Sequence, residues 1–505
     1  MKEGKYKEAQ SQLDYPEAEF VFGFVFPTGT DYSGVLLTLQ NYIKRFNYIP
    51  KEIRLSDYIS AIQTKVNTGV ILDDTSEMAR IDAYMTAGNK ICELAKDDSF
   101  LAAAAVAEIS RRRKRSEESP SGEPLPRYAH ILTSLKRPKE VDLLRAIYGS
   151  GFYLIGVFAP EKDRLKYLTQ DKNIPWREAI RLMRRDQDEA VAFGQRSRDT
   201  FQLSDVFIQL KQDGYKEQLE RFLDLVFGYP YITPTPDEYA MLMAYSASVR
   251  SGSLSRQVGS AIRSHGGDIV ALGCNDVPAP GGGLYWPGPL DARDHVRGID
   301  SNDSERTNIV KDVLRCLKLE VELKDALALL KNSKLMDISE YGRAVHAEMD
   351  ALLTCGRIGA SAVGATVFST TFPCHNCTRH LIAAGVERVV YIEPYPKSMA
   401  SVLHKDAIEL PGAREVKLHD GRKRIPFEPF VGIGPRRFYD LFSMKLGTGS
   451  RLRRKDENGT IVRWRRDEAK PRVQMLPTSY IQREKVVAAG FLSTVEELGG
   501  ARNGI

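Results

Sequence analysis

The chain has few cysteines, few tryptophans and no long apolar run. Six cysteines among 505 residues exclude a disulfide-stabilised scaffold. Clustered cysteines are therefore candidates for metal binding or catalysis. No run of about 18 apolar residues occurs, so we expect no membrane span. The start of the chain, residues 1–5, is polar and lacks the apolar core of a secretory signal, so we expect a cytoplasmic protein.

The composition is that of a folded protein with an uneven charge distribution. Apolar residues make up 42% and charged residues 27%, and a length of 505 residues predicts two or three domains. Residues 422–472 hold 15 basic and 6 acidic side chains, so the net charge of +6 comes from this segment. Either a phosphate-bearing partner, such as a regulatory RNA, or a solvated charged surface explains it. A second basic run, residues 111–115, allows the same two interpretations.

The first 230 residues alternate between strand and helix patterns. The apolar run 19–26 predicts a buried strand, which a glycine-bearing turn and a helix over 35–46 follow. The alternation continues, with strands expected over 128–133 and 152–158 and helices over 139–148, 177–194 and 207–225. Strands separated by helices indicate a parallel sheet.

The turn after the first strand is a degenerate phosphate-binding loop. A working loop reads Gly-x-x-x-x-Gly-Lys-Ser/Thr, and its lysine reaches the terminal phosphates. Here the turn contains Gly23, Gly29 and Thr30, but the spacing differs by one, no lysine follows, and Asp31 would repel phosphate. We expect these three residues to bind a nucleotide at most, without phosphoryl transfer, in a sensor or regulatory domain over residues 1–230.

Three prolines between Tyr229 and Pro236 break all regular structure and mark the main domain boundary near residue 230. A second α/β domain follows. Its expected elements are a helix from residue 236, strands over 257–262 and 268–273, a helix over 342–354, a strand over 365–369, a helix over 374–384 and a strand over 388–392. This order predicts three α/β/α layers.

The most informative residues form two short motifs in this second domain. His346 and Glu348 make a His-x-Glu motif, and Pro373-Cys-x-x-Cys follows with Cys374 and Cys377. This order is the signature of zinc deaminases. Two thiolates at the start of a helix can hold one ion because the helix dipole lowers their pKa. His346 supplies a third ligand, and the fourth tetrahedral position stays open for water, as in catalytic zinc sites.

Glu348 is expected to move protons rather than bind the metal. Zinc lowers the pKa of its water towards about 7. Glu348 would take a proton from this water and pass it to ring N3 of a cytosine and then to the leaving amine. The predicted reaction is hydrolytic deamination, in which oxygen attacks C4, ammonia leaves and uracil results.

Residues from about 236 to 405 resemble the deoxycytidylate deaminase branch of the zinc cytidine deaminase superfamily. The resemblance rests on five stretches, 256–262, 273–278, 346–348, 373–377 and 385–391. It implies that Asn275 holds the sugar 3′-hydroxyl and the phosphate. Asp350 stands where the family often has asparagine. The other candidate substrate contacts are Ala347, Arg256, Tyr395 and Lys397.

The whole chain resembles the bacterial anti-phage dCTP deaminase family. That architecture joins a P-loop-kinase-like half to a deaminase domain, here over 231–410, and segment 427–437 is also typical of it. We expect the basic extension, 411–505, to pack on the deaminase domain. The resemblance implies deamination of free deoxycytidine nucleotides, dCTP or dCMP, which starves phage DNA synthesis. It also implies a homo-oligomer, with a hexamer among the possible states.

A nucleic-acid deaminase or an RNA-binding protein is the alternative. An enzyme that deaminates a polymer must flip a base into its pocket and hold the flanking backbone. Arginines near Trp464 could supply phosphate and stacking contacts, namely Arg451, Arg453, Arg454, Arg463, Arg465 and Arg466. The sequence leaves open the choice between dCMP and dCTP.

Overall fold

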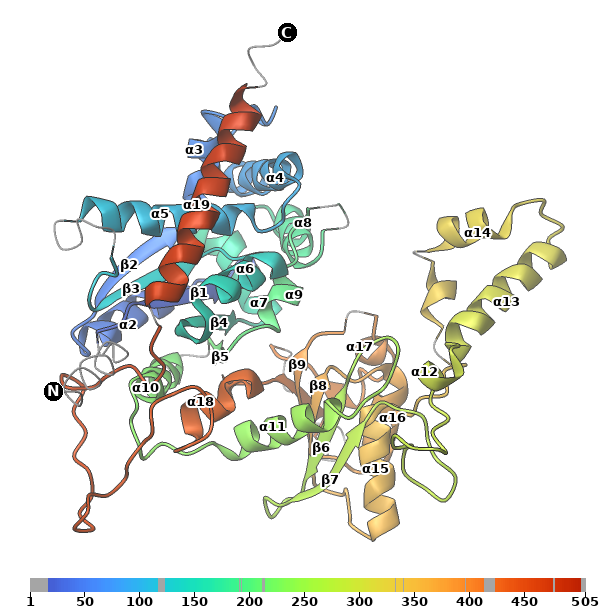
Figure 1. The fold of residues 1–505 in the computed structure, drawn as a ribbon. Coiled ribbons are helices and arrows are strands. Elements are labelled where there is room, and N and C mark those ends of the chain that lie inside the picture. The colour runs from blue at the N-terminus through green and yellow to red at the C-terminus, as the bar shows by residue number, and fades with distance from the viewer. Residues whose placement is uncertain are drawn as a thin grey trace. The chain divides into compact units, whose positions relative to one another are not determined.

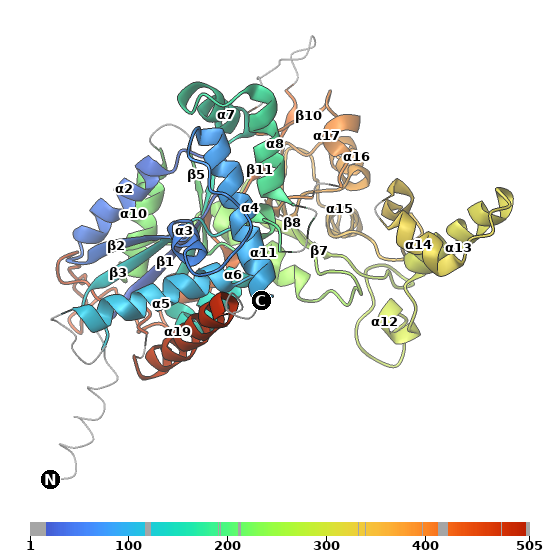
Figure 2. The same cartoon turned by 90° about the horizontal axis from the view of Figure 1, so that it is seen from above.

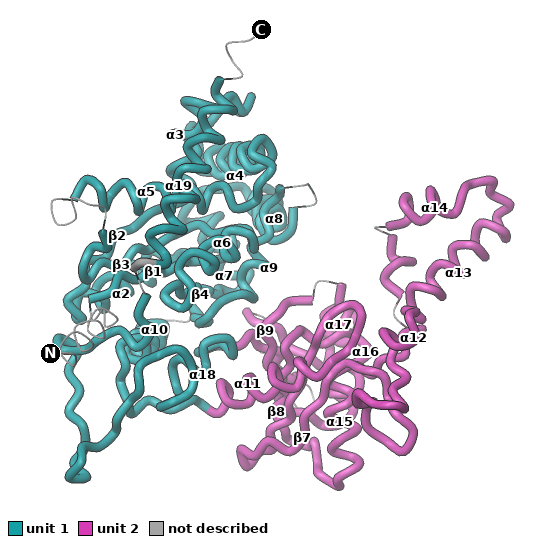
Figure 3. The backbone as a smooth tube through the Cα atoms, viewed as in Figure 1, with its two compact units in different colours: residues 1–235, 431–505 teal, residues 236–430 magenta. Residues whose placement is uncertain are grey.

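Two compact units make up the chain. The computed structural model describes residues 17–116, 123–189, 191, 193–210, 214–331, 333–338, 340–395, 397–412, 423–475 and 477–500. Unit 1 comprises residues 1–235 and 431–505, and unit 2 comprises residues 236–430 (Figure 3). Each unit holds a six-stranded sheet with helices, which confirms the predicted α/β class. Within the described residues, every helix is too short or too polar to cross a bilayer.

The sheet of unit 1 has the strand order β12-β5-β4-β1-β3-β2. Its strands are β1 (Phe20–Val25), β2 (Ile49–Arg54), β3 (Tyr128–Thr133), β4 (Phe152–Phe158), β5 (Val206–Gln209) and β12 (Gly432–Ile433). Neighbouring strands pair in parallel, except that β12 runs antiparallel to β5. All six residues of β1 are buried, because strands on both sides and helices on both faces cover the centre of a parallel sheet.

Helices cover both faces of this sheet. Those before unit 2 are α2 (Ser33–Lys44), α3 (Asp57–Gln63), α4 (Glu77–Ala95), α5 (Phe100–Arg115), α6 (Pro138–Tyr148), α7 (Glu161–Lys166), α8 (Trp176–Gln187), α9 (Ser197–Phe201) and α10 (Gly214–Val226). Those after it are α18 (Phe438–Phe442) and α19 (Pro477–Gly500). Figures 1 and 2 show α2 and α10 on one face of the sheet and α5, α6 and α19 on the other.

Three expectations for unit 1 differ from the structure. The helix predicted over 177–194 is wrong at its end, because α8 ends at Gln187. The helix predicted over 207–225 is wrong at its start, because Val206–Gln209 form β5 and the helix begins only at Gly214. The extension 411–505 was expected to pack on the deaminase domain. Its part from Val431 onwards belongs to unit 1 instead, where Gly432 pairs with Phe207. Residues 413–422 lie outside the described residues.

A buried charge cluster explains why α19 packs in unit 1. Arg113 of α5 donates to Glu19 at 2.8 Å and to Glu484 of α19 at 2.9 Å, and all three side chains are at most 1% exposed. Tyr480 of α19 also donates to Glu19, at 2.9 Å. Removing Arg113 would leave two buried carboxylates without their cation, so the cluster fixes the position of α19. Arg113 therefore has a structural role within the basic run 111–115.

The sheet of unit 2 has the order β10-β11-β9-β8-β6-β7. Its strands are β6 (Gly259–Arg263), β7 (Ile269–Cys274), β8 (Thr366–Thr371), β9 (Arg388–Glu393), β10 (Ile408–Glu409) and β11 (Ile425–Pro429). Its helices are α11 (Pro236–Ser248), α12 (Asp294–Arg297), α13 (Ser301–Cys316), α14 (Leu323–Leu330), α15 (Ala347–Ile358), α16 (His375–Ala383) and α17 (Ala400–Leu403). The predicted order of elements is confirmed, and α12 to α14 form an insertion that the sequence did not predict.

Two glycines let helices approach opposite faces of this sheet. A Cβ on Gly259 of β6 would lie 1.9 Å from the carbonyl oxygen of Ala244 in α11. A Cβ on Gly273 of β7 would lie 2.2 Å from the carbonyl oxygen of Ala347 in α15. Gly273 pairs with Ser260, the neighbour of Gly259, so the two glycines face opposite sides. The result is the expected three-layer arrangement, with α15 held close to the sheet.

Candidate metal centre

The three predicted metal ligands meet at the starts of two helices. His346 is the residue before α15, and Cys374 is the residue before α16. The Nδ1 atom of His346 lies 3.3 Å from Sγ of Cys374 and 3.4 Å from Sγ of Cys377. All three ligand atoms lie within 4.8 Å of one another. One nitrogen and two sulfur atoms at these separations fit a tetrahedral ion with one open position.

The environment of the Cys374 thiol favours its thiolate form, whereas the neighbouring Cys374 and burial raise the pKa of Cys377. Cys374 accepts a hydrogen bond from the backbone N–H of Cys377 at 3.4 Å, which ties its sulfur to the first turn of α16. Hydrogen bonds from Cys377 and His346 lower the pKa of the Cys374 thiol to about 3. A thiolate is the form that binds a metal.

Glu348 lies in the first turn of α15, buried beside the metal ligands. Its side chain is 4% exposed, and one carboxylate oxygen accepts a hydrogen bond from the Ser369 hydroxyl at 3.0 Å. Burial raises the pKa of Glu348, because the charged carboxylate is poorly solvated there. A raised pKa makes the carboxylate a stronger base, which suits the predicted role of Glu348 in taking a proton from water.

A cavity of about 210 Å³ opens at this centre. Every predicted metal, catalytic and substrate residue of unit 2 except Cys377 lines it, namely His346, Glu348, Cys374, Asn275, Ala347, Arg256, Tyr395 and Lys397. Asp337 also lines the cavity and pairs with Lys397 at 2.6 Å, and it lies in a short 3-10 helix, Lys334–Asp337, that the sequence did not predict. Ser369 was not predicted either, since a serine inside a strand pattern carries no signal of its own.

The Asn275 side chain holds the backbone of the cavity wall through two hydrogen bonds. Its Oδ1 accepts from the backbone N–H of Val258 at 2.6 Å, and its Nδ2 donates to the Arg256 carbonyl at 2.8 Å. The Arg256 guanidinium stacks over the Tyr395 ring at 4.8 Å and pairs with Glu393 at 3.1 Å. Asn275 therefore clamps the segment that carries Arg256.

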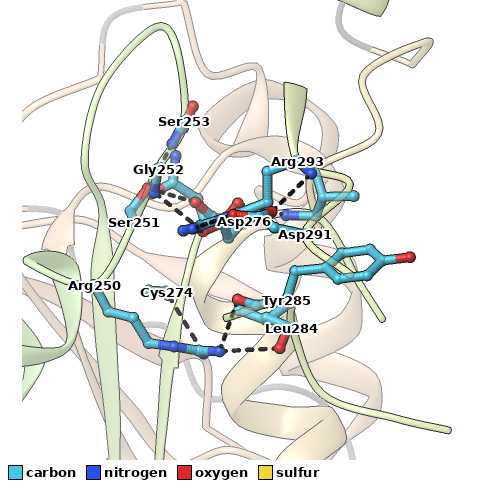
Figure 4. A network of polar contacts seen from close by, with 12 residues as sticks. Arg250, Ser251, Gly252, Ser253, Cys274, Asp276, Leu284, Tyr285, Asp291 and Arg293 are labelled. Carbon is cyan, nitrogen blue, oxygen red and sulfur yellow. Dashed lines mark hydrogen bonds and ion pairs between the residues drawn. The ribbon is translucent and has the colours of Figure 1, made fainter. Parts of the chain in front are cut away.

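A network of polar contacts holds the loop around Asn275 in place (Figure 4). The carboxylate of Asp276 is 1% exposed and accepts from the backbone N–H of Gly252 at 3.0 Å and from Arg293 at 3.4 Å. The Ser251 hydroxyl donates to the Asn275 carbonyl at 2.6 Å. Arg293 precedes α12, so the network ties the insertion to the wall of the cavity.

Two of the three residues predicted to bind a nucleotide in the N-terminal loop lie at the same cavity, and the third does not. Gly29 and Thr30 line a separate cavity in unit 1. Gly23 does not line it, because it lies inside β1, where an added Cβ would meet Leu135 at 2.7 Å. The hydroxyl of Thr30 donates to the Pro27 carbonyl at 2.7 Å and so closes the turn.

Comparison with known proteins identifies the family. The model of the cytidine and deoxycytidylate deaminase zinc-binding region matches residues 234–393. The deoxycytidylate deaminase of Enterobacteria phage T2 is 30% identical over 156 residues, which are 31% of this chain and 79% of the phage protein. This chain belongs to the deoxycytidylate deaminase family. The deoxycytidylate deaminase of Enterobacteria phage T4 is 28% identical over 158 residues, 31% of this chain and 77% of that protein.

A solved structure is also similar. The dCMP deaminase from cyanophage S-TIM5 in complex with dCMP and dUMP has 19% sequence identity and a TM-score of 0.24, and covers 40% of this chain and 100% of its own. The metal of the deoxycytidylate deaminase family site is zinc, and His346, Cys374 and Cys377 provide a ligand set that fits it.

Proposed function

We propose that this protein deaminates free deoxycytidine nucleotides, converting dCTP or dCMP to the uracil nucleotide and ammonia. The observation that carries the proposal is Glu348, a buried carboxyl group held by Ser369 and placed two residues from His346 at the cavity. Zinc, when bound, supplies an activated water. Glu348 moves the protons that the reaction requires, from water to ring N3 and to the departing amine.

Residues around the cavity favour a free nucleotide over a polymer. Arg256 and Lys397 line it, and each cation is paired with a carboxylate, Glu393 or Asp337. A substrate phosphate would replace these carboxylates as the partner of the two cations.

The alternative function assigns polymer binding to the basic segment. Side chains of this segment instead make contacts within unit 1. The Trp464 ring packs against Tyr229 at 4.9 Å between centroids, and its Nε1–H donates to the Phe227 carbonyl at 3.3 Å. Arg466 pairs with Asp224 at 3.0 Å and with Glu220 at 2.6 Å. These side chains stabilise their own fold, which weakens the case for a stacking platform for bases.

A substrate panel tests the proposal directly. The zinc-loaded full chain is incubated with dCMP, dCDP, dCTP, CTP and a cytosine-bearing oligonucleotide, and ammonia and uracil products are measured. We expect turnover of at least one deoxycytidine nucleotide and none of the oligonucleotide. In Glu348→Gln turnover falls by about 10²–10⁴-fold or more while zinc stays bound, because the carboxyl group moves protons and does not bind metal. Exclusive turnover of the oligonucleotide would establish the alternative.

We further propose that unit 1 is a P-loop-kinase-like regulatory module and that deamination depletes dCTP as a defence against phage. A regulatory RNA and a homo-oligomer, such as a hexamer, complete the proposal. The test is the plating efficiency of phage on cells that express the full chain or Glu348→Gln. We expect protection only with the active chain, together with a fall in cellular dCTP. Equal protection by both chains would refute the depletion mechanism.

A further inference from the structure

The insertion that lies between β7 and α15 reaches the metal-centre cavity from both of its ends. At its start, Arg293 directly precedes α12 and pairs with Asp276 in the cavity wall. At its end, Asp337 closes the 3-10 helix after α14, lines the cavity and pairs with Lys397. The insertion, residues 293–337, therefore has one charged side chain at each end that acts on a group of the cavity.

Asp276 connects the metal ligand to the substrate side of the cavity. Its carboxylate is 1% exposed and accepts from the backbone N–H of Gly252 at 3.0 Å. Its backbone carbonyl accepts from the N–H of Val345 at 2.9 Å, and Val345 is the residue before the metal ligand His346. A displacement of Asp276 would therefore reach both sides of the cavity.

Asn275 and Asp276 together hold the loop that carries Arg256 at both of its ends. This Arg256 loop comprises residues 251–258. At its start, the Ser251 hydroxyl donates to the Asn275 carbonyl at 2.6 Å, and the next backbone N–H donates to the Asp276 carboxylate. At its end, the Asn275 side chain donates to the Arg256 carbonyl at 2.8 Å. Arg256 lines the cavity, so its position there depends on both anchor points.

Arg293 is the cation that the structure pairs with the buried Asp276 carboxylate (Figure 4). The guanidinium belongs to a residue that is 6% exposed, and its Nη1 lies 3.4 Å from Asp276. It also pairs with Asp291 at 2.6 Å. A Cβ on Gly252 would lie 3.0 Å from the same Nη1, so the guanidinium packs against the start of the Arg256 loop. Loss of this cation would leave a buried carboxylate uncompensated beneath the loop.

Arg343 ties the backbone around Arg293 to the segment of the metal ligand. Arg343 lies three residues before His346 in the sequence. Its guanidinium donates to the Ala292 carbonyl at 3.1 Å and pairs with Asp294 at 2.8 Å. The residues on both sides of Arg293 are thus held, which fixes the position from which its guanidinium reaches Asp276.

The other end of the insertion opposes a substrate phosphate. Asp337 and Lys397 both line the cavity and pair at 2.6 Å, and their side chains are 41% and 61% exposed. A phosphate group bound there would take the ammonium group of Lys397 as its partner, and the Asp337 carboxylate competes for it and repels the phosphate. Exposed ion pairs of this kind are weak, so a phosphate can displace Asp337 at a small cost in affinity.

We infer that the insertion sets the affinity of the cavity for its nucleotide from both ends. Arg293 is a positioning residue that strengthens binding through Asp276 and the Arg256 loop, and Asp337 weakens binding by competing for Lys397. The inference rests on the proposed function, since it takes a phosphorylated substrate as the ligand. The two ends act with opposite sign, which a general loss of stability would not produce.

Nucleotide affinity measured with and without turnover tests this inference. The Kd values of dCMP and dCTP are measured by calorimetry in the zinc-loaded Glu348→Gln chain, and kcat and KM in the active chain. Adding Arg293→Gln should raise Kd and KM by about tenfold or more while kcat stays within about threefold. Adding Asp337→Asn should lower Kd and KM by about two- to fivefold.

A double variant and two controls separate positioning from folding. Combining Asp276→Asn with Arg293→Gln removes the uncompensated carboxylate and keeps an acceptor for the loop, so Kd should return to within about threefold of the starting value. Arg297→Gln and Asp325→Asn remove exposed charges of α12 and α14 and should leave Kd unchanged. Melting temperatures check folding, and the exposed Asp337 keeps the test decisive if Arg293→Gln unfolds.

Three results would overturn the inference. They are an unchanged Kd in a folded Arg293→Gln chain, no recovery in the double variant, and unchanged or weaker binding in Asp337→Asn. Binding of a cytosine nucleotide by the Glu348→Gln chain, without turnover of any substrate by the unaltered chain, would refute the proposed function alone. Absence of binding of both dCMP and dCTP would refute both proposals.

Discussion

The two units place helix starts beside a sheet and use them in opposite ways. In unit 2, His346 and Cys374 precede α15 and α16, and their side chains converge on one point beside a cavity. In unit 1, Asp31 accepts from the backbone N–H and the hydroxyl of Ser33 at the start of α2, at 3.3 and 2.5 Å. Asp186 takes the N–H of Thr28.

The comparison shows that a helix start attracts anions in both units but that the nearest side chains decide its chemistry. Thiolates and an imidazole leave room for an ion and its substrate. In unit 1, carboxylates of the protein accept from the N–H groups in the equivalent position, so these groups have no free donor for another anion. There the N–H groups of Thr28 and Ser33 are already paired with carboxylates of the protein.

Removing one metal ligand should break unit 2 alone. In Cys374→Ala we expect zinc to be lost and deamination to fall below detection, because two protein ligands hold zinc poorly. Metal analysis and the substrate panel measure both effects. Unit 1 should keep its unfolding transition, monitored by Trp464 in a chain where Trp176 and Trp286 are phenylalanine. Retention of stoichiometric zinc would show that the ligand set is wrong.

Removing one partner of the buried charge cluster should break unit 1 alone. In Glu484→Gln, Arg113 keeps one buried carboxylate instead of two and loses its charge-assisted hydrogen bonds to α19, and we expect a loss of about 1.5–3 kcal/mol in the free energy of unfolding. Urea unfolding followed by Trp464 measures it. Glu497→Gln is the control, since Glu497 is exposed on α19 and accepts from the Ser493 hydroxyl there. Equal stability of the two variants would contradict the structural role of the cluster.

Acid should weaken unit 1 through Glu19. Burial raises its pKa, but the charge of Arg113 and the hydrogen bond to His130 outweigh burial and lower it from 4.5 to about 2. A carboxyl group with a lowered folded pKa stabilises the fold above its unfolded pKa. This stabilisation, on the order of 3 kcal/mol, is lost as pH falls from about 4.5 to 2.

The free energy of unfolding of unit 1 between pH 6 and pH 2.5 measures this dependence. Glu19→Gln should be less stable at neutral pH and show a flatter pH dependence than the unaltered chain. Parallel curves for the two chains would mean that Glu19 does not titrate as the structure implies.

Asn275→Ala should loosen the cavity wall of unit 2 without disturbing its metal. The loss of two hydrogen bonds frees the segment that carries Arg256, so we expect kcat/KM for the nucleotide to fall by about 10–100-fold. Zinc content should be unchanged. Asn308→Ala, which removes an exposed amide bonded to Glu305, is the control. A kcat/KM equal to that of the control would remove Asn275 from the site.

Local motifs could be predicted from the sequence, and long-range pairs could not. The metal ligands were predictable because each belongs to a short motif of neighbouring residues. The start of the helix at His346 was not predictable, since the helix expected from residue 342 begins only at Ala347. The strand β1 was predictable as an unbroken apolar run. By contrast, the four residues of β5 are too few to show the alternation typical of a strand, and their apolar side chains fit the helical periodicity that follows.

Partners that are distant in sequence account for the remaining differences. Arg113 lies in a run of five basic residues, which by itself indicates a solvated or phosphate-binding surface. It is buried because Glu19 and Glu484 converge on it from both ends of the chain. The same reason applies to residues 431–505, whose place in unit 1 depends on pairs such as Gly432 with Phe207. Asp337, which lines the cavity, could not be predicted because it is 60 residues before Lys397 in the sequence and meets it only in the folded chain.

The interruption of unit 1 by unit 2 sets an order of events during synthesis. Glu484 follows Arg113 by 371 residues. At about 5–20 residues per second, roughly 20–75 s pass between the appearance of the two side chains on the ribosome. During this interval Arg113 has only Glu19 to pair with, and the face of α5 that receives α19 stays uncovered. Unit 1 therefore reaches its sealed form only after all of unit 2 has been translated, and a chain released before α19 is made presents an unfinished core to proteases and chaperones.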